Sequence, residues 1–416
     1  MKNKANSFII QTNHLTRQDT MQPVDQHKLM LIDRDEFNRR IDHIKSQMAE
    51  PGIPALLISD NANKYYVTGR VFDGYVYIPL EGPVIFFIRR PVELEGDGVV
   101  YIRKPEDIAS SIGLNVPEAI GLELDVLPYS TATRLKNIFP ESELKNASGV
   151  MRRARAVKTP AQIDMIRHSG IKHVHVYSRI QHIFQSGMTD MELQVEIERV
   201  SRLEGCLGQF RISGDSMELY MGNVLVGDNA DAPSPYDFAM GGAGLDPSLP
   251  VGACGTPIKP GNTVMVDMNG NFNGYMTDMT RVFALGEISP LAIEAHKCSI
   301  DIHRTFCDMM RPGVLAKDLY AKAEEMVKER GLSAYYMGHR QHAGFIGHGV
   351  GIEINELPVI APRSRDIIAE GNVIALEPKF VIPHTGAVGI ENTYAVHDDH
   401  VECLTPAPEE ISYFDV

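Results

Sequence analysis

The first third of the chain alternates helical and strand-like patterns of apolar residues. Residues 35–48 carry apolar side chains at helical spacing, and Pro51-Gly52 ends that segment. Short apolar runs bounded by Gly and Pro follow, and they predict strands at 54–58, 75–79, 83–88 and 99–102. Residues 1–30 are mostly polar. These patterns predict a polar tail over residues 1–30 and a small α/β domain over residues 31–155.

A different pattern begins after the basic stretch at residues 151–158. Thr159 is a candidate helix cap, with Pro160 at the first helical position and Gln162 completing a capping box. The pattern then predicts helices at about 160–185 and 190–204, strands up to about 286, helices at about 289–310 and 315–330, and a strand-rich remainder. A helix pair followed by strands, repeated once, predicts an α+β domain with two similar halves over residues 156–416.

The composition is that of an ordinary globular protein, because 44% of the 416 residues are hydrophobic and 23% are charged. A net charge of −14 disfavours nucleic acid as a partner. No apolar run approaches the roughly 18–20 residues that span a bilayer, and the N-terminal segment lacks the apolar core of a signal peptide. The five cysteines form no metal-binding or redox motif. We therefore expect a cytoplasmic protein that binds neither nucleic acid nor membrane.

Two predicted hairpins carry acidic residues inside apolar strands. In the first hairpin, residues 271–274 (Asn-Phe-Asn-Gly) are the candidate loop, since Asn-Gly favours the positive φ of a tight turn. A loop of those four residues sets Asp267 opposite Asp278 across the two strands. This register predicts two carboxylates face to face.

The second hairpin repeats the arrangement. A three-residue loop at 383–385 sets Glu377 opposite Glu391. Like charges on opposed strand positions are destabilising, and burial of an unpaired carboxylate adds to the cost. A positive charge is therefore expected among the four carboxylates. It is either a metal ion or a basic side chain of the hairpins, Lys379 or Arg281.

A fifth candidate ligand is His348, which lies among Gly347, Gly349 and Gly351. Glycines allow the backbone to approach an imidazole closely. Four carboxylates and one imidazole are enough ligands for two divalent ions, and they suit Mn²⁺, Co²⁺, Fe²⁺ or Zn²⁺. Paired ions can share a water, lower its pKa and polarise a carbonyl group.

The ordered ligand set resembles that of the pita-bread metallopeptidases, in particular the branch of Xaa-Pro dipeptidase (prolidase) and aminopeptidase P. The resemblance implies a pita-bread catalytic domain behind a smaller α/β domain, a short peptide substrate and a homodimer. It also implies two metal ions, with Mn²⁺ or Co²⁺ preferred. Asp267 would bind one ion, His348 and Glu377 the other, and Asp278 and Glu391 would bridge both. Glu377 would also carry the proton of the attacking water, with His348 beside it in the catalytic set.

The residues around the metal set depart from the family pattern. The family's second His is replaced by Asn355, and two further His positions hold Gly344 and Val251. The Arg of the family motif before the last Glu is replaced by Gly389. Asn355 is therefore a candidate substrate contact, and His342 is a candidate replacement donor. Two other loop histidines that could compensate are His339 and His384.

Three functions are compatible with these residues. The first is a metal-dependent exopeptidase, a Xaa-Pro dipeptidase or aminopeptidase P-like enzyme, that cleaves the N-terminal bond of short peptides. The second is a metal-dependent non-peptidase hydrolase or lyase of the same fold that acts on a small amine or acid. The third is a binding protein on this fold. It is disfavoured because none of the five ligands is lost.

Overall fold

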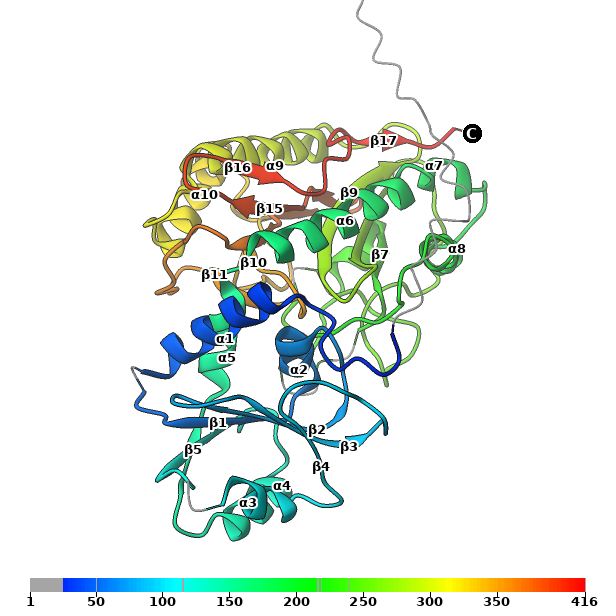
Figure 1. Cartoon of the computed structure of the whole chain (residues 1–416). Helices are drawn as coiled ribbons and strands as arrows, with labels where there is room; N and C mark the ends of the chain where they lie inside the picture. The colour runs from blue at the N-terminus through cyan, green and yellow to red at the C-terminus, as the bar shows by residue number, and fades with distance from the viewer. Residues whose placement is uncertain are drawn as a thin grey trace, which may run out of the picture.

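The computed structural model describes residues 25–415, apart from residues 50, 114, 115, 215, 216, 218 and 239. In Figure 1 an N-terminal part lies below a larger C-terminal part. Most of the expected tail, residues 1–24, lies outside the described residues. The described end of that segment packs on the N-terminal part. There Leu29 is buried, and its N–H donates a hydrogen bond to the Glu95 carbonyl at 3.0 Å.

The N-terminal part is built around one mixed sheet in the order β4-β3-β2-β1-β5-β6. Its strands are β1 Ala55–Ile58, β2 Asp73–Pro79, β3 Ile85–Arg90, β4 Val99–Tyr101, β5 Ala119–Leu122 and β6 Glu143–Asn146. Its helices are α1 Arg34–Ala49, α2 Asn61–Thr68, α3 Asp107–Ile112, α4 Tyr129–Ile138 and α5 Ser148–Ala156. The helix and four strands predicted before residue 102 are confirmed.

Helices cover both faces of this sheet, as Figure 1 shows. Successive residues of a strand point to opposite faces. Leu56 and Ile58 of β1 therefore join one hydrophobic core with α1 and α2, while Ala55 and Leu57 join another with α3 and α4. The first core continues into strands of the C-terminal part, so it also joins the two parts of the molecule.

The C-terminal part combines helices with antiparallel strands. Its helices are α6 Pro160–Tyr177, α7 Ile180–Ile183, α8 Asp190–Leu203, the 3₁₀ turn η1 Gly227–Asp231, α9 Pro290–Met309 and α10 Ala316–Glu329. Its strands are β7 Gly222–Val226, β8 Thr263–Asn271, β9 Met276–Ala284, β10 Gly347–Gly349, β11 Glu356–Ile360, β12 Val373–Leu376, β13 Lys379–Ile382, β14 Gly386–Gly389, β15 Asn392–Val396, β16 Val401–Cys403 and β17 Ser412–Tyr413. They pair in the orders β17-β9-β8-β7, β11-β10-β12-β15-β16 and β13-β14.

The two halves predicted for this part are present. Helices α6 to α8 pack with β7, β8 and β9 around one core, and α9 and α10 pack with β12 to β15 around another. The predicted capping box at the start of α6 is also formed. Thr159 Oγ1 accepts from the Gln162 N–H at 3.3 Å, and Gln162 Oε1 accepts from the Thr159 N–H at 2.9 Å. A bridge between Thr280 and Glu391 brings the two halves together at the site described below.

The predicted register of the first hairpin is wrong. Asn271 stays in the ladder opposite Met276, so Asp267 faces Thr280 and Asp278 faces Asn269. The reason lies in the loop, where the Asn271 side chain accepts a hydrogen bond from the Gly274 N–H at 2.9 Å and so closes the turn from inside the strand. Asp267 and Asp278 still share one face of the sheet, because they are diagonal neighbours.

The register of the second hairpin is confirmed, but the predicted pairing of Glu377 with Glu391 across the strands is only partly correct. Ile382 pairs with Gly386 and Lys379 pairs with Gly389, as expected. The β13–β14 ladder ends at that pair, so Glu377 and Glu391 lie beyond it and are not cross-strand partners. Their carboxylates nevertheless approach the same point, which is the Lys379 ammonium.

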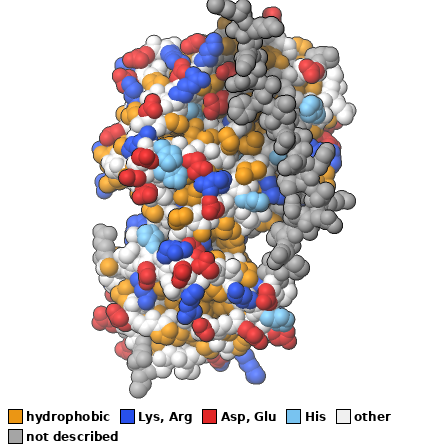
Figure 2. Space-filling model, turned by 45° about the horizontal axis from the view of Figure 1, so that its top comes forward, with side chains coloured by type: hydrophobic (Ala, Val, Ile, Leu, Met, Phe, Trp, Pro, Cys, Tyr) orange, Lys and Arg blue, Asp and Glu red, His pale blue; other side chains and the backbone are white. Residues whose placement is uncertain are grey.

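The molecular surface carries charges of both signs. On the face shown in Figure 2, Lys and Arg side chains are interspersed with Asp and Glu side chains. Within the described part of the chain, no helix is long and apolar enough to cross a membrane.

Candidate metal centre and active site

The five predicted metal ligands converge from both halves of the C-terminal part. Asp267 lies in β8, Asp278 in β9 and His348 in β10; Glu377 directly follows β12, and Glu391 directly precedes β15. Potential ligand atoms of Asp278, His348 and Glu391 lie within 4.8 Å of one another. A second group with the same spacing consists of Asp267, Glu377 and Glu391. The two groups share Glu391.

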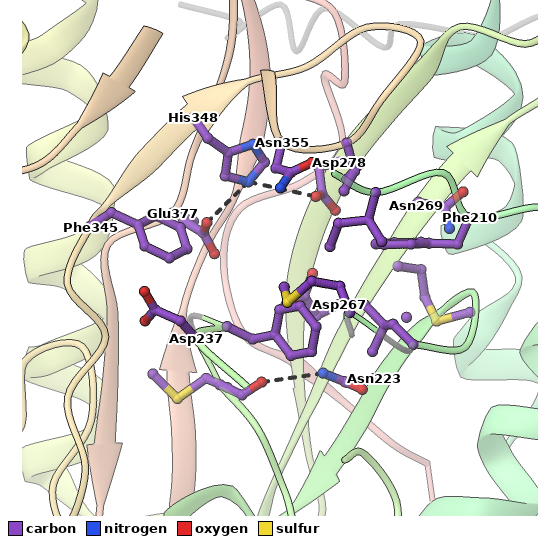
Figure 3. A pocket seen from close by; sticks show the side chains of 18 of the residues that line it. Phe210, Asn223, Asp237, Asp267, Asn269, Asp278, Phe345, His348, Asn355 and Glu377 are labelled. Atoms are coloured by element: carbon purple, nitrogen blue, oxygen red, sulfur yellow. Dashed lines mark hydrogen bonds and ion pairs between the residues drawn. The ribbon is translucent and has the colours of Figure 1, made fainter. Parts of the chain in front are cut away.

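His348 has one ring nitrogen directed into this cluster (Figure 3). Its Nε2 lies 3.3 Å from Glu377 Oε1 and 3.9 Å from Asp278 Oδ2, while Nδ1 lies 3.1 Å from the Gly349 carbonyl oxygen. A proton on Nδ1 would leave the Nε2 lone pair free to bind a metal. The flanking glycines serve the predicted close approach, because a Cβ on Gly349 would overlap the Leu357 carbonyl group.

Lys379 lies among the carboxylates and is the basic side chain that pairs with them. Its Nζ is 2.8 Å from Asp267 Oδ2, 2.7 Å from Glu377 Oε2 and 3.1 Å from Glu391 Oε2. Arg281, the other candidate, donates to backbone carbonyl oxygens and to the Asn392 side chain instead.

The cluster holds more negative charge than one ammonium offsets. Burial raises the pKa of Asp278 well above its usual value, and repulsion from Glu391 adds to the effect. Burial and the neighbouring Glu377 raise the pKa of Glu391 to about 8. Burial also opposes ionisation of Glu377, but Lys379 and His348 outweigh it and hold that pKa at about 2. Such an uncompensated cluster favours an additional cation.

A cavity of about 300 Å³ is lined by four of the five predicted ligands, all except Glu391. Its walls are mostly apolar: Phe210, Ile212, Met217, Leu219, Phe238, Met240, Met268, Phe345, Ile354 and Val359. Its polar lining consists of Asn223, Asn269, Asn355, Asp237, Asp267, Asp278, Glu377 and His348. The cavity therefore combines an apolar chamber with an acidic end (Figure 3).

The two predicted substrate contacts lie in different places. Asn355 lines the cavity, and its side chain exchanges two hydrogen bonds with the Ser213 backbone: Oδ1 accepts at 2.8 Å and Nδ2 donates at 2.6 Å. His342 lines a smaller adjoining cavity, and its Nδ1 lies 2.8 Å from the Tyr336 carbonyl oxygen. Asp237 and Phe238 contribute to both cavities.

The other two loop histidines lie outside the main cavity lining. His339 Nδ1 lies 2.9 Å from Asp231 Oδ2, and His384 Nδ1 lies 3.2 Å from Asp228 Oδ2. The cavity residues Phe210, Ile212, Asp237 and Phe238 lie in loops before and after β7, and they had no recognisable sequence signal because they belong to neither a helix nor a strand. Asp237 in particular is one isolated acidic residue in a loop.

The family comparison agrees with this geometry. The model of metallopeptidase family M24 matches residues 164–398, which is more than half of the chain and includes all five predicted ligands. The chain belongs to metallopeptidase family M24. This M24 peptidase is therefore a metal-dependent hydrolase. The creatinase/prolidase N-terminal domain model matches residues 40–157, and together the two matches account for the predicted pita-bread architecture with its α/β N-terminal domain.

Individual relatives extend over nearly the whole chain. The M24 peptidase is 25% identical over 383 residues to an Xaa-Pro dipeptidase of Pyrococcus horikoshii, covering 91% of this chain and 99% of the relative. It is 24% identical over 386 residues to the uncharacterized peptidase YqhT of Bacillus subtilis, covering 89% and 99%.

Solved structures share the fold. An Xaa-Pro dipeptidase from Bacillus anthracis superposes with a TM-score of 0.75 at 22% identity, covering 91% of this chain and 99% of that one. The N-terminal domain of the FACT complex subunit SPT16 from chickpea superposes with a TM-score of 0.69 at 14% identity, covering 92% and 100%. Proteins with such different names share this fold, so the activity has to be argued from the site.

The residues present fit a divalent metal ion in one of the two ligand groups. Glu391 is 1% exposed, and its Oε1 has no hydrogen-bond partner in the described part of the chain, although its Oε2 accepts from Thr280 Oγ1 at 2.8 Å. A buried carboxylate oxygen without a partner, beside His348 and Asp278, is a ready metal ligand. The other group differs, because the Lys379 ammonium already lies among its oxygens.

Proposed function

We propose that this M24 peptidase is a metal-dependent exopeptidase that hydrolyses the N-terminal peptide bond of short peptides. The observation that carries the proposal is the convergence of Asp278, His348 and Glu377 in the lining of a mostly apolar cavity. The named Xaa-Pro dipeptidase relatives support a peptide as the substrate.

The candidate metal ligands are the five converging residues Asp267, Asp278, His348, Glu377 and Glu391. A bound divalent ion would polarise the scissile carbonyl group and lower the pKa of a water. Mn²⁺ or Co²⁺ is the preferred ion for this oxygen-rich set, and Zn²⁺ or Fe²⁺ is possible. The expectation of two ions corresponds to the two ligand groups, one of which already surrounds the Lys379 ammonium.

The chain's own residues would divide the remaining work. The carboxylate of Glu377 lies 3.3 Å from His348 Nε2 and is the proposed proton acceptor, and Lys379 Nζ orients it from 2.7 Å. The apolar walls would bury the side chain of the first substrate residue, and the acidic end would attract its ammonium group. Asn355 would act on the substrate by holding the wall segment at Ser213. His342 would contact only a substrate that extends into the adjoining cavity.

The lining also favours one type of exopeptidase. A dipeptide carries its free carboxylate next to the scissile bond, and binding it calls for a cationic partner. Among the described residues that line the cavity, no Lys or Arg is present, and four are acidic. We therefore propose that the enzyme prefers peptides longer than two residues, as an aminopeptidase does, over dipeptides.

A peptide panel tests this function. Protein loaded with Mn²⁺ or Co²⁺ would be assayed on Xaa-Pro and Xaa-Ala dipeptides, their C-terminal amides and the matching tripeptides. We expect release of the first residue, with amides and tripeptides turned over faster than free dipeptides. Turnover of free dipeptides as fast as that of their amides would contradict the length preference. If every peptide is inert and a small amine or acid is converted, the alternative of a non-peptidase hydrolase or lyase is correct.

Three further expectations belong to the same proposal. Residues 31–155 and 156–416 would be separate domains behind the tail at 1–30. The enzyme would act in the cytoplasm as a homodimer, without nucleic acid or membrane as a partner. Gel filtration with light scattering measures the oligomeric state directly.

A further inference from the structure

The Lys379 ammonium occupies the second ligand group. An ammonium has three N–H donors, and Lys379 directs them at one oxygen each of Asp267, Glu377 and Glu391, at 2.8, 2.7 and 3.1 Å. Those three residues are the ones whose oxygens lie close enough together to hold one ion. The side chain therefore lies where a metal bound by that group would lie.

Lys379 is held in this position by its surroundings. The residue is 0% exposed. Its carbonyl oxygen accepts from the Met337 N–H at 2.8 Å, and its own N–H points at the Met337 sulfur at 3.3 Å. On the other side it pairs with Gly389 in the β13–β14 ladder. An ion that displaced the ammonium would leave a buried cation without its partners, which is strongly unfavourable.

Two of the three residues in the first ligand group, Asp278 and His348, are not paired with the ammonium. Among the contacts of the described residues, Lys379 makes none with Asp278 or His348. Glu391 belongs to both groups; its Oε2 accepts from Lys379, and its buried Oε1 has no partner among the described residues. Its free oxygen is available to an ion that Asp278 and His348 also bind.

We propose that this M24 peptidase binds a single divalent ion, at Asp278, His348 and Glu391, and that Lys379 supplies the second positive charge of the site. Four carboxylates then share one ion, one ammonium and the imidazole. Asp267 and Glu377 serve as partners of the lysine instead of metal ligands. Glu377 is consequently free of the constraint that coordination would put on a proton acceptor. The inference rests on the metal dependence of the proposed function, but it does not depend on which substrate is cleaved.

Metal stoichiometry tests the proposal without any activity assay. Wild-type protein, saturated with Mn²⁺ and freed of excess ion by gel filtration, should contain one Mn²⁺ per chain by elemental analysis. Its electron paramagnetic resonance spectrum should be that of an isolated Mn²⁺, without exchange coupling to a second ion. Two tightly held ions, or a coupled spectrum, would overturn the proposal.

Variants separate the lysine from the ligands. Lys379→Ala should raise the stoichiometry from one to two, because it opens the second group; a stoichiometry that stays at one would overturn the role of the lysine. Lys158→Met is the matched control, since it removes another buried ammonium outside the site and should leave one ion bound.

If Lys379→Ala does not fold, one carboxylate variant in each ligand group tests the assignment. Asp278→Asn should lose the ion and Asp267→Asn should keep it, whereas equal loss in both would contradict the assignment. If the wild-type protein binds one ion but hydrolyses no peptide, the proposed function is wrong while the single-ion proposal stands.

Discussion

Replacing Glu356 with Gln should destabilise the contact between the two parts of the molecule. Glu356 is the first residue of β11, and its side chain is 2% exposed. Its Oε2 accepts from Lys158 Nζ at 2.9 Å, and Arg155 Nε lies 3.5 Å from its Oε1. Arg155 lies at the end of α5, and Lys158 lies just before α6. The carboxylate therefore ties the segment between the domains to a strand that pairs with β10, where His348 lies.

The expected loss is large because both cations are buried. The side chains of Arg155 and Lys158 are 4% and 1% exposed. Gln keeps the size of Glu and one acceptor, but it removes the charge that both cations face. Breaking a buried ion pair from one side costs about 3–5 kcal/mol. For a folding unit of about 150–250 residues, each kcal/mol lowers the melting temperature by about 2–4 °C. Glu356→Gln should therefore melt at least about 6 °C below wild type.

Differential scanning calorimetry at neutral pH measures this drop. Glu353→Gln is the matched control. It removes a neighbouring carboxylate that also pairs with Arg155. The Glu353 side chain is 11% exposed, more than that of Glu356, so the loss of stability should be smaller. Combining Glu356→Gln with Lys158→Met should recover part of the loss, because one unpaired cation is then removed. A melting temperature for Glu356→Gln within about 1 °C of wild type would refute this reasoning.

Three further predictions concern pH, catalysis and the cavity wall. Burial alone would raise the pKa of Glu356, but its two cationic partners outweigh burial and hold it below 4.5. Its stabilisation is complete above about pH 4.5 and is lost as the pH falls further, so acid should lower the melting temperature of wild type more than that of Glu356→Gln. Glu377→Gln should lower kcat by about 10²–10⁴ in steady-state assays, as expected for loss of a proton acceptor. Asn355→Ala removes both hydrogen bonds to Ser213 and should raise KM more than it lowers kcat; an effect confined to kcat would contradict its role in holding the wall.

The elements of the fold could be predicted because local patterns decide them. Helical spacing before Pro51 and the capping box at Thr159 each describe contacts between close neighbours in sequence, and both are present in the structure. Register depends on more distant contacts. The first hairpin shifts because Asn271 closes its own turn, a side-chain hydrogen bond that the Asn-Gly pattern does not specify.

The convergence of the five candidate ligands could be predicted from residue type and order, whereas their surroundings could not. Lys379 was one of two basic residues that could neutralise the carboxylates, and only the folded chain distinguishes it from Arg281, whose donors meet backbone carbonyl groups. Asn355 was expected to face the substrate, yet its polar atoms are used by Ser213. That partner lies 142 residues away in sequence, in a segment without periodicity.

We propose that this M24 peptidase cleaves peptides from a free N-terminus with a metal bound by Asp278 and its neighbours. The most direct measurement is mass spectrometry of the products from a tripeptide with an apolar first residue, beside its N-acetylated form. With Mn²⁺-loaded protein, we predict release of the first residue from the free peptide only. Chelation or Asp278→Asn should abolish the release, and restored Mn²⁺ should recover it in wild type. Cleavage of the acetylated peptide, or release that survives both chelation and Asp278→Asn, would contradict the claim.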